Sequence, residues 1–156
     1  MNIPADEDLS AIRLANEQFY RALTNLDLGA MESVWAHDGA VRCIHPGWEI
    51  VEGWEAVQKT WDLIFRNTTS LIVEPTDVKV RVEGGMAWVC CLETITSREV
   101  DGGTTTARAT NLFVRKDDQW KLVLHHASQI PTDRPDASGP GGTPDGPEED
   151  GEPTVH

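Results

Sequence analysis

Polar residues that stand among apolar neighbours in the expected strands are the first candidates for chemistry. Residues 120–128 read as a strand that holds two adjacent histidines, His125 and His126. Because successive side chains of a strand point to opposite faces, His126 has the parity of Leu122 and Leu124. A histidine on an apolar face needs a hydrogen-bond partner and titrates near neutral pH. We therefore expect His126 to face a partly polar pocket.

Other polar residues are expected at the same pocket. Glu93 shares one face of its strand with Cys91, and Asn111 shares one face of the next strand with Ala109 and Phe113; either face of these strands is fairly apolar, so their parity stays open. His45 ends a short strand, and Trp48 follows in the next loop. An acid, an amide and two imidazoles around an apolar cavity could perform acid/base chemistry. Burial raises the pKa of a carboxyl group and a nearby imidazolium lowers it, so Glu93 could hold or pass a proton near pH 7.

Each of these residues also has a structural interpretation. Glu93 could be a solvated strand residue, Asn111 could satisfy backbone groups, and His126 could be a hydrogen-bonded core histidine. His45 could be an ordinary loop residue. His125 has the opposite parity and is expected at the surface or at a subunit contact. The residues alone leave these alternatives open.

Metal and cofactor sites are not predicted. Two histidines and one carboxylate satisfy the count for a mononuclear metal site, but no HxH or HxxxH spacing accompanies them. Cys43, Cys90 and Cys91 show no CxxC spacing, so we expect reduced thiols and no structural zinc. No serine elbow, phosphate-binding glycine loop or dinucleotide fingerprint occurs, so we expect no cofactor.

Hydrophobic periodicity predicts the elements that must position these residues. Apolar residues at three- and four-residue steps predict a helix over residues 6–25, and Asp27 can cap a second, short helix. Gly53 opens a third helix, which carries a stripe of bulky side chains. Beyond residue 70 the period changes to two, and turns separate three long strands. These strands are expected at residues 86–99, 104–115 and 120–130. Helices followed by a curled antiparallel sheet predict an α+β cone whose interior would hold a ligand.

Length and charge indicate one domain followed by a tail. The chain has 156 residues, 39% of them hydrophobic, so residues 1–131 are expected to form a single domain with one core. Residues 132–156 contain seven acids, one arginine, five prolines and five glycines, which predicts a disordered acidic tail. The net charge of −13 disfavours nucleic acid and anionic membranes as partners. No apolar run of membrane-spanning length and no secretory signal occurs, so we expect a cytoplasmic protein.

Four segments within residues 9–130 have an order and spacing that resemble a known family: Phe19–Leu23, Asp27–Asp38, Val51–Trp54 and Trp120–Ser128. On these segments the chain resembles the nuclear transport factor 2-like (NTF2-like) superfamily, in its SnoaL-like branch. The last two segments are also similar to the association domain of calcium/calmodulin-dependent kinase II. The resemblance implies a cone-shaped cystatin-like roll, with three N-terminal helices packed on a curved antiparallel sheet, and usually a homodimer through the sheet. The superfamily hosts isomerases, cyclases, dehydratases, scaffolds and transport factors, so the fold alone does not select a function.

The resemblance also implies roles for individual residues. His45, with the proline after it, falls where ketosteroid isomerase has its Asp-Pro, which is the general-base position. Phe19 lies near the oxyanion tyrosine of that enzyme, and Tyr20 is one residue further on. One residue is a rotation of about 100° on a helix, so the tyrosine donor is expected to be missing. Glu93 and Asn111 fall where the kinase association domain has pocket arginines, which disfavours an anionic ligand.

Two main hypotheses follow for the function. In the first, an isomerase-, cyclase- or dehydratase-type enzyme takes a small hydrophobic carbonyl compound, and His45 or Glu93 moves a proton next to the carbonyl. Asn111 and His126, which matches a histidine common to the kinase branch, would orient or polarise the substrate. The remaining expected ligand contacts are Phe19, Tyr20, Trp48 and Cys91. In the second hypothesis the chain is a non-catalytic dimeric module for ligand binding or assembly. A regulatory role of the acidic tail is a third, weaker possibility.

Overall fold

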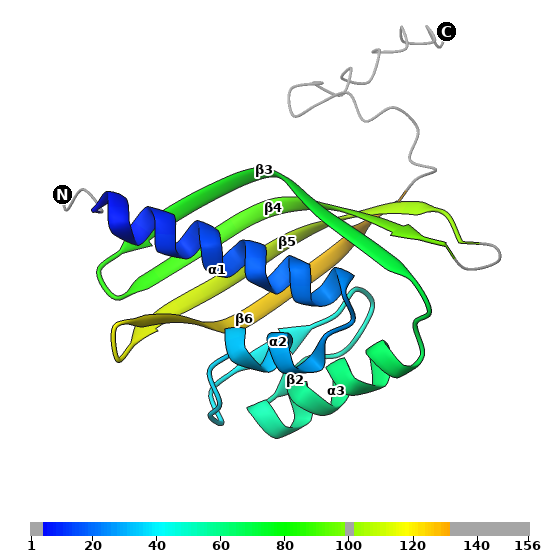
Figure 1. Cartoon of the computed structure of the whole chain (residues 1–156), viewed down its shortest axis with the longest axis horizontal. Helices are drawn as coiled ribbons and strands as arrows, with labels where there is room; N and C mark the ends of the chain where they lie inside the picture. The colour runs from blue at the N-terminus through cyan, green and yellow to red at the C-terminus, as the bar shows by residue number, and fades with distance from the viewer. Residues whose placement is uncertain (1–4, 99–101, 132–156) are drawn as a thin grey trace, which may run out of the picture.

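The computed structural model describes residues 5–98 and 102–131. These residues form three helices and six strands (Figure 1). In chain order the elements are α1 (Asp6–Thr24), α2 (Leu28–Val34), β1 (Arg42–Ile44), β2 (Val51–Glu52), α3 (Trp54–Arg66), β3 (Leu71–Glu83), β4 (Met86–Ser97), β5 (Thr104–Lys116) and β6 (Gln119–Ile130). The helices and the long strands lie close to their predicted ranges. The sequence pattern does not predict β2, which is only two residues long.

The strands form one curved sheet in the order β2-β1-β6-β5-β4-β3. Helix α1 runs along the sheet and packs against β3, while α2 and α3 pack together at one end, where α3 contacts β1 and β2 (Figure 1). This arrangement confirms the predicted α+β cone. The sheet is mixed, however, because β1 runs parallel to β6, with Ile44 opposite His126. A parallel pair is possible here because a long connection, which includes α3 and four strands, separates β1 from β6.

Local sequence sets where the helices begin. Three acidic residues occupy the first turn of α1, where negative charge is favoured by the helix dipole. The Asp27 carboxylate caps α2 by accepting a hydrogen bond from the Ala30 backbone N at 3.0 Å. Gly53 precedes α3 with a φ of 85°, a left-handed conformation that glycine adopts without steric cost. The two capping residues therefore start the helices where the sequence predicts.

The faces of β4 and β5 that carry Glu93 and Asn111 point into the core. Each side chain of the set that forms these two faces is at most 6% exposed. The set consists of Ala87, Val89, Cys91, Glu93, Ala107, Ala109, Asn111 and Phe113. Phe19 of α1 and Trp35, which directly follows α2, complete the core above this face. On this face, apolar side chains therefore surround two polar ones, Glu93 and Asn111.

A β-bulge changes the parity of β6. The pairs Phe113–Leu122 and Leu112–Leu124 leave Val123 without a partner in the ladder. One extra residue moves all later side chains of a strand to the opposite face. As a result His125 is buried and His126 is exposed. The prediction that His126 faces the interior is therefore wrong, and so is the prediction that His125 lies at the surface.

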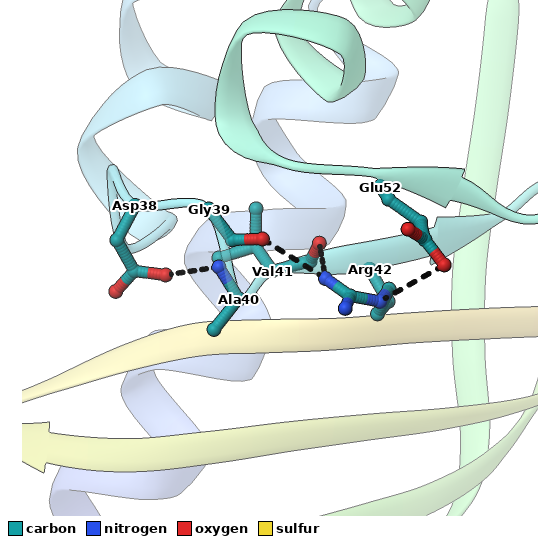
Figure 2. A network of polar contacts seen from close by, with 6 residues as sticks. All are labelled: Asp38, Gly39, Ala40, Val41, Arg42 and Glu52. Atoms are coloured by element: carbon teal, nitrogen blue, oxygen red, sulfur yellow. Dashed lines mark hydrogen bonds and ion pairs between the residues drawn. The ribbon is translucent and has the colours of Figure 1, made fainter.

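Polar contacts fix the start of β1, and with it the position of His45. The Asp38 carboxylate accepts a hydrogen bond from the Ala40 backbone N at 2.8 Å. The Arg42 guanidinium donates to two backbone carbonyls just before it, both at 3.0 Å, and lies 3.6 Å from the Glu52 carboxylate of β2 (Figure 2). The network therefore joins the turn before β1 to both strands of the short hairpin.

Some predictions fall outside the described residues. They concern the acidic tail at residues 132–156 and residue 99, the predicted end of the strand that begins at residue 86. The domain boundary at residue 131 stays a prediction. No helix in the part of the chain that the structure describes is long and apolar enough to span a membrane.

Candidate functional site

Six polar or thiol side chains meet in the core between α1 and the sheet. All of them are buried, and they come from four elements. They are Asn16 and Tyr20 of α1, Cys91 and Glu93 of β4, Asn111 of β5 and His125 of β6. A four-residue step on α1 and a two-residue step on β4 place each neighbouring pair on one face. Polar groups at such depth need hydrogen-bond partners, and these six supply partners to one another.

The hydroxyl of Tyr20 lies at the centre of this cluster. It donates a hydrogen bond to Glu93 Oε2 at 2.7 Å and accepts one from Asn111 Nδ2 at 3.1 Å. Cys91 Sγ lies 3.2 Å from the same oxygen. Tyr20 is therefore buried in the core, but its proton is directed to Glu93, so the absence of an oxyanion tyrosine donor stays a prediction. Helix α1 is covered over a wide face, so both Phe19 and Tyr20 are buried despite the rotation between them.

Asn111 links Tyr20 to the imidazole of His125. Its amide nitrogen also donates to Asn16 Oδ1 at 2.9 Å, and its Oδ1 lies 2.6 Å from His125 Nδ1. An amide oxygen can only accept, so His125 carries its proton on Nδ1 and has its lone pair on Nε2. The hydrogen bonds therefore fix a neutral tautomer of His125.

His45 lies in a second polar group beside the cluster. Its Nε2 is 2.8 Å from Thr60 Oγ1, and that hydroxyl donates to the Val57 carbonyl at 2.7 Å. Because the threonine proton is committed to the helix backbone, His45 donates from Nε2 and has its lone pair on Nδ1. Cys43 Sγ lies 3.6 Å from His45 Nε2, and the half-exposed ring of Trp48 lies 4.8 Å from the imidazole. His45 is therefore an oriented, neutral imidazole close to the surface loop.

The indole of Trp61 connects the two groups. Its ring centroid lies 4.6 Å from that of His45 and 6.1 Å from that of His125. Phe19 packs against the rings of Tyr20 and His125 at 4.9 and 4.8 Å. Aromatic rings therefore fill the space between the two imidazoles.

Burial shifts the pKa values of these groups in a consistent direction. Desolvation raises the pKa of Glu93 to about 7, although the Tyr20 hydrogen bond opposes the shift. Desolvation lowers the pKa of His45 to about 4 and that of His125 to about 3, and the charges of His45 and His126 add to the second shift. Desolvation also raises the pKa of Tyr20, with a further contribution from the Glu93 charge. Near neutral pH both imidazoles are neutral and Glu93 changes charge.

The structure brings most of the predicted site residues together. Tyr20, Cys91, Glu93 and Asn111 are in direct hydrogen-bonding contact, and Phe19 packs against Tyr20. The second group holds His45 and Trp48 together. His126 belongs to neither group because the bulge turns it outward.

Sequence reasoning misses four residues of the site. Asn16 lies on the apolar stripe of α1, and a polar residue there was a signal that could have been found. His125 is missed because the bulge at Val123 leaves no mark in the residue pattern. Thr60 and Trp61 follow Val57 on α3, where a bulky stripe indicates burial and gives no sign of chemistry.

Surface hollows lie away from these residues. One of about 620 Å³ is lined by His37, Trp54 and Lys59, among others, and one of about 450 Å³ by Trp35 and Lys116, among others. Neither is lined by a predicted site residue, so a ligand pocket inside the cone stays a prediction. Within residues 5–98 and 102–131, no group of three His, Cys, Asp or Glu side chains is placed to hold a metal ion.

The chain is similar to several known proteins. It is 30% identical over 118 residues to the F-box protein SKIP8 of Arabidopsis thaliana, covering 76% of this chain and 49% of that protein, so it spans about half the length of this relative. A Streptomyces avermitilis protein of the NTF2-like family, provisionally named a dehydratase, is 37% identical with a TM-score of 0.76, covering 81% of this chain and 98% of that one. A Thiobacillus denitrificans protein, provisionally assigned as a calcium/calmodulin-dependent protein kinase type II association domain, is 29% identical with a TM-score of 0.69, covering 75% and 93%.

These similarities agree with the fold. Solved NTF2-like structures with a cystatin-like fold share the helices and curved sheet of this chain, which confirms the predicted architecture. The sequence profile of the SnoaL-like domain matches residues 12–133, which is most of the chain. The chain therefore belongs to the SnoaL-like domain family, with an NTF2-like fold.

Proposed function

We propose that the chain binds a small, uncharged, largely apolar carbonyl compound beside the buried cluster and that Glu93 moves a proton on it. The main observation that supports this proposal is the 2.7 Å hydrogen bond between Tyr20 Oη and Glu93 Oε2, which lies inside the core. The SnoaL-like family and its NTF2-like relatives support a small-molecule site of this kind. The reaction class is proton transfer at the carbon next to a carbonyl, as in an isomerase, cyclase or dehydratase.

Glu93 is the group suited to carry the proton. Its pKa of about 7 leaves the carboxyl group about half ionised at neutral pH, which suits a general acid or base. Tyr20 holds the carboxylate in one orientation, Asn111 holds Tyr20, and His125 holds Asn111. These three act through Glu93 and are positioning residues. His45 is neutral and its Nδ1 lone pair has only the Cys43 thiol nearby, at 3.9 Å, so it is the second candidate for a base.

The charges around the cluster favour an uncharged ligand. No Lys or Arg of the described residues is hydrogen-bonded to the cluster, and both imidazoles are neutral near pH 7. An anionic ligand would meet the Glu93 carboxylate with no cation to offset it. The surrounding Phe19 and Ala109 side chains are apolar and suit a hydrocarbon skeleton. The exposed ring of Trp48, 43% accessible beside His45, is where we expect a ligand to enter.

Hydrogen–deuterium exchange tests this proposal directly. The protein is incubated in D2O with cyclic ketones such as 1-tetralone, and deuterium at the α-carbon is followed by NMR. We expect exchange above the buffer rate in the unaltered chain and its loss in Glu93→Gln, which keeps the shape of the side chain. Glu74→Gln, at an exposed position of β3, is the matched control. Equal exchange in Glu93→Gln and the unaltered chain would contradict the proposed role.

A second candidate is a dimeric binding or assembly module without catalysis. The outer face of the sheet carries Trp88, Leu112 and Leu124, which remain partly exposed because they point away from the helices. Burying such a face against a second copy would remove apolar surface from water. Light scattering after size-exclusion chromatography tests this proposal, and Trp88→Glu should convert a dimer to a monomer. A monomeric unaltered chain at micromolar concentration would contradict it.

We also propose a cytoplasmic location. The three cysteines are free in the structure, and reduced thiols are typical of a reducing compartment. Fractionation of the native cells with an antibody against the chain would test this. Recovery in the membrane or extracellular fraction would contradict it.

A further inference from the structure

Trp61 carries a buried hydrogen-bond donor that has no acceptor. Helix α3 directs Val57, Trp61 and Phe65 into the core, and Trp61 is only 2% exposed. Across residues 5–98 and 102–131, its Nε1 is the one buried side-chain nitrogen or oxygen without a hydrogen-bond partner. An indole nitrogen can only donate. Buried donors in native proteins are nearly always satisfied, so this exception requires an explanation.

A second buried tryptophan shows that the fold can satisfy such a group. Trp35 is 1% exposed, and its Nε1 donates to Met31 Sδ at 3.4 Å. Trp61 differs in its surroundings, because it lies in the proposed site. Its ring is nearly perpendicular to His45, at 85° and 4.6 Å, and also contacts His125 at 6.1 Å. The unpaired donor therefore belongs to the side chain that lies between the two imidazoles.

Neither imidazole has a proton free to compete for an acceptor at this point. His45 donates from Nε2 to Thr60, and His125 donates from Nδ1 to Asn111. The Tyr20 hydroxyl proton is likewise directed to Glu93. Of the buried ring N–H and hydroxyl donors in and beside the cluster, the indole of Trp61 is the one that has no acceptor.

We infer that Trp61 Nε1–H donates to the carbonyl oxygen of the ligand, and that this contact makes the site selective for uncharged carbonyl compounds. The inference rests on the proposed function and names the residue that recognises the carbonyl group of its substrate. A hydrocarbon offers no acceptor, and an ammonium group offers only donors. A carboxylate would bring negative charge close to Glu93. A ketone, an aldehyde or an ester with an apolar skeleton satisfies both the indole donor and the apolar surroundings.

The contact also gives Trp61 a role in the proposed reaction. When the C–H bond next to the carbonyl breaks, its proton goes to Glu93 and its electron pair forms the C=C bond of an enolate. The carbonyl π electrons then move to the oxygen, which becomes negative. A hydrogen bond to that oxygen is stronger in the enolate than in the ketone, so Trp61 would stabilise the transition state. Return of the proton from Glu93 to carbon completes the step without an oxidant or reductant.

A pair of probes with and without the carbonyl tests the inference. 1-Tetralone and tetralin share a ring skeleton, and only the first carries an acceptor. The indole N–H signal of Trp61, assigned through its contacts with Phe19 and His45, is followed by ¹H–¹⁵N NMR during titration. We expect a downfield shift with 1-tetralone and no comparable shift with tetralin. In Trp61→Phe the affinity for 1-tetralone should fall about fivefold to tenfold, as for loss of one net hydrogen bond, while tetralin affinity is kept.

Matched variants and outcomes separate this inference from the proposed function. Trp35→Phe removes an equally buried indole outside the site and should leave the affinity ratio of the two probes unchanged. If 1-tetralone shifts the signals of Tyr20 and Asn111 but leaves that of Trp61 in place, the inference is wrong and the proposed site survives. If Trp61→Phe lowers the affinity for 1-tetralone and for tetralin equally, Trp61 contributes only apolar contact and no hydrogen bond, and the inference is also overturned. If neither probe binds at millimolar concentration, both proposals fail. Should Trp61→Phe not fold, the signal of the unaltered chain still decides.

Discussion

Tyr20 and Glu93 lie 73 positions apart in the sequence and share a 2.7 Å hydrogen bond in the core. The bond connects α1 to β4, so it contributes both to packing and to the chemistry of the carboxyl group. Its two effects can be separated, because one changes the free energy of unfolding and the other changes the pKa of Glu93.

Tyr20→Phe should raise the pKa of Glu93 above its value of about 7. The phenol donates to the ionised carboxylate and thereby lowers its pKa, so removal of the hydroxyl leaves burial to act alone. The free energy of unfolding should fall by about 1–2 kcal/mol, since a buried hydrogen bond is lost. The carboxyl ¹³C shift of Glu93 against pH and urea unfolding measure the two effects. Thr60→Val, which removes the partner of His45, should leave the pKa of Glu93 in place. An unchanged or lower pKa in Tyr20→Phe would contradict the assignment.

Glu93→Gln should stabilise the fold at alkaline pH. The pKa of Glu93 is raised in the folded chain, so its contribution to stability is full below about pH 4 and is lost as the pH rises through about 7. The amide cannot ionise and avoids this loss. We expect a gain of about 1–3 kcal/mol in the free energy of unfolding at pH 8 and little change at pH 4. Urea unfolding at both pH values measures it, and a variant less stable than the unaltered chain at pH 8 would be evidence against a desolvated carboxylate.

The two buried imidazoles should make the chain sensitive to acid. The pKa values of His45 and His125 are lowered, so their contributions are present above about pH 6.5 and are lost as the pH falls toward 4 and 3. Between about pH 4.3 and 6.5, acidification lowers the free energy of unfolding through both imidazoles and raises it through Glu93 alone, so the two imidazoles outweigh the carboxyl group. The free energy of unfolding should therefore fall on acidification across this window. A free energy of unfolding that stays constant or rises on acidification across this window would show that the imidazoles are hydrated.

His125→Ala and His126→Ala should differ strongly although the residues are adjacent. Loss of His125 leaves the Asn111 amide oxygen without its partner at 2.6 Å and opens space in the core, so we expect a loss of about 2–4 kcal/mol. His126 is exposed, and its replacement should change the stability by no more than about 0.5 kcal/mol. Chemical denaturation of both variants under monomeric conditions measures the difference. Similar costs at the two positions would argue against the bulge.

Native thiol labelling should detect one cysteine out of three. Cys90 is exposed on the outer face of β4, while Cys43 and Cys91 are buried. Burial also raises the pKa of Cys91 to about 11, which disfavours the reactive thiolate. A disulfide reagent at pH 8 should therefore modify one thiol per chain before unfolding and three after it. Mass spectrometry identifies the site, and rapid labelling of Cys43 would contradict the packing around His45.

Sequence periodicity is enough to predict the helices and the sets of side chains that share a face on β4 and β5. Asp27 and Gly53 mark helix starts through local chemistry, so their effect does not depend on the rest of the fold. Strict alternation over β4 and β5 places Glu93 and Asn111 inward, because no irregularity interrupts those parts of the strands that carry them. Half of the polar cluster is therefore available from parity alone.

The inward positions of His125 and Tyr20, and the contact of His45 with α3, depend on tertiary geometry. The bulge at Val123 arises where β5 and β6 pair, and an apolar strand residue gives no local sign of it. The inward direction of Tyr20 depends on how much of α1 the sheet covers. The contact between His45 and Thr60 joins β1 to α3, two elements whose relative placement no local pattern fixes.

Val123 acts as a spacer that selects between two neighbouring rings. Removing Val123, or adding one residue between it and the His125-His126 dipeptide, would turn the interior imidazole outward and the exterior one inward. The His-His dipeptide itself would stay intact. In relatives that carry the same His-His pair, the number of residues between the pair and the preceding turn should therefore decide which histidine corresponds to His125. The same spacer offers protein engineers a switch: one codon could move a titratable ring from the solvent side to the enclosed side without introducing a new functional group.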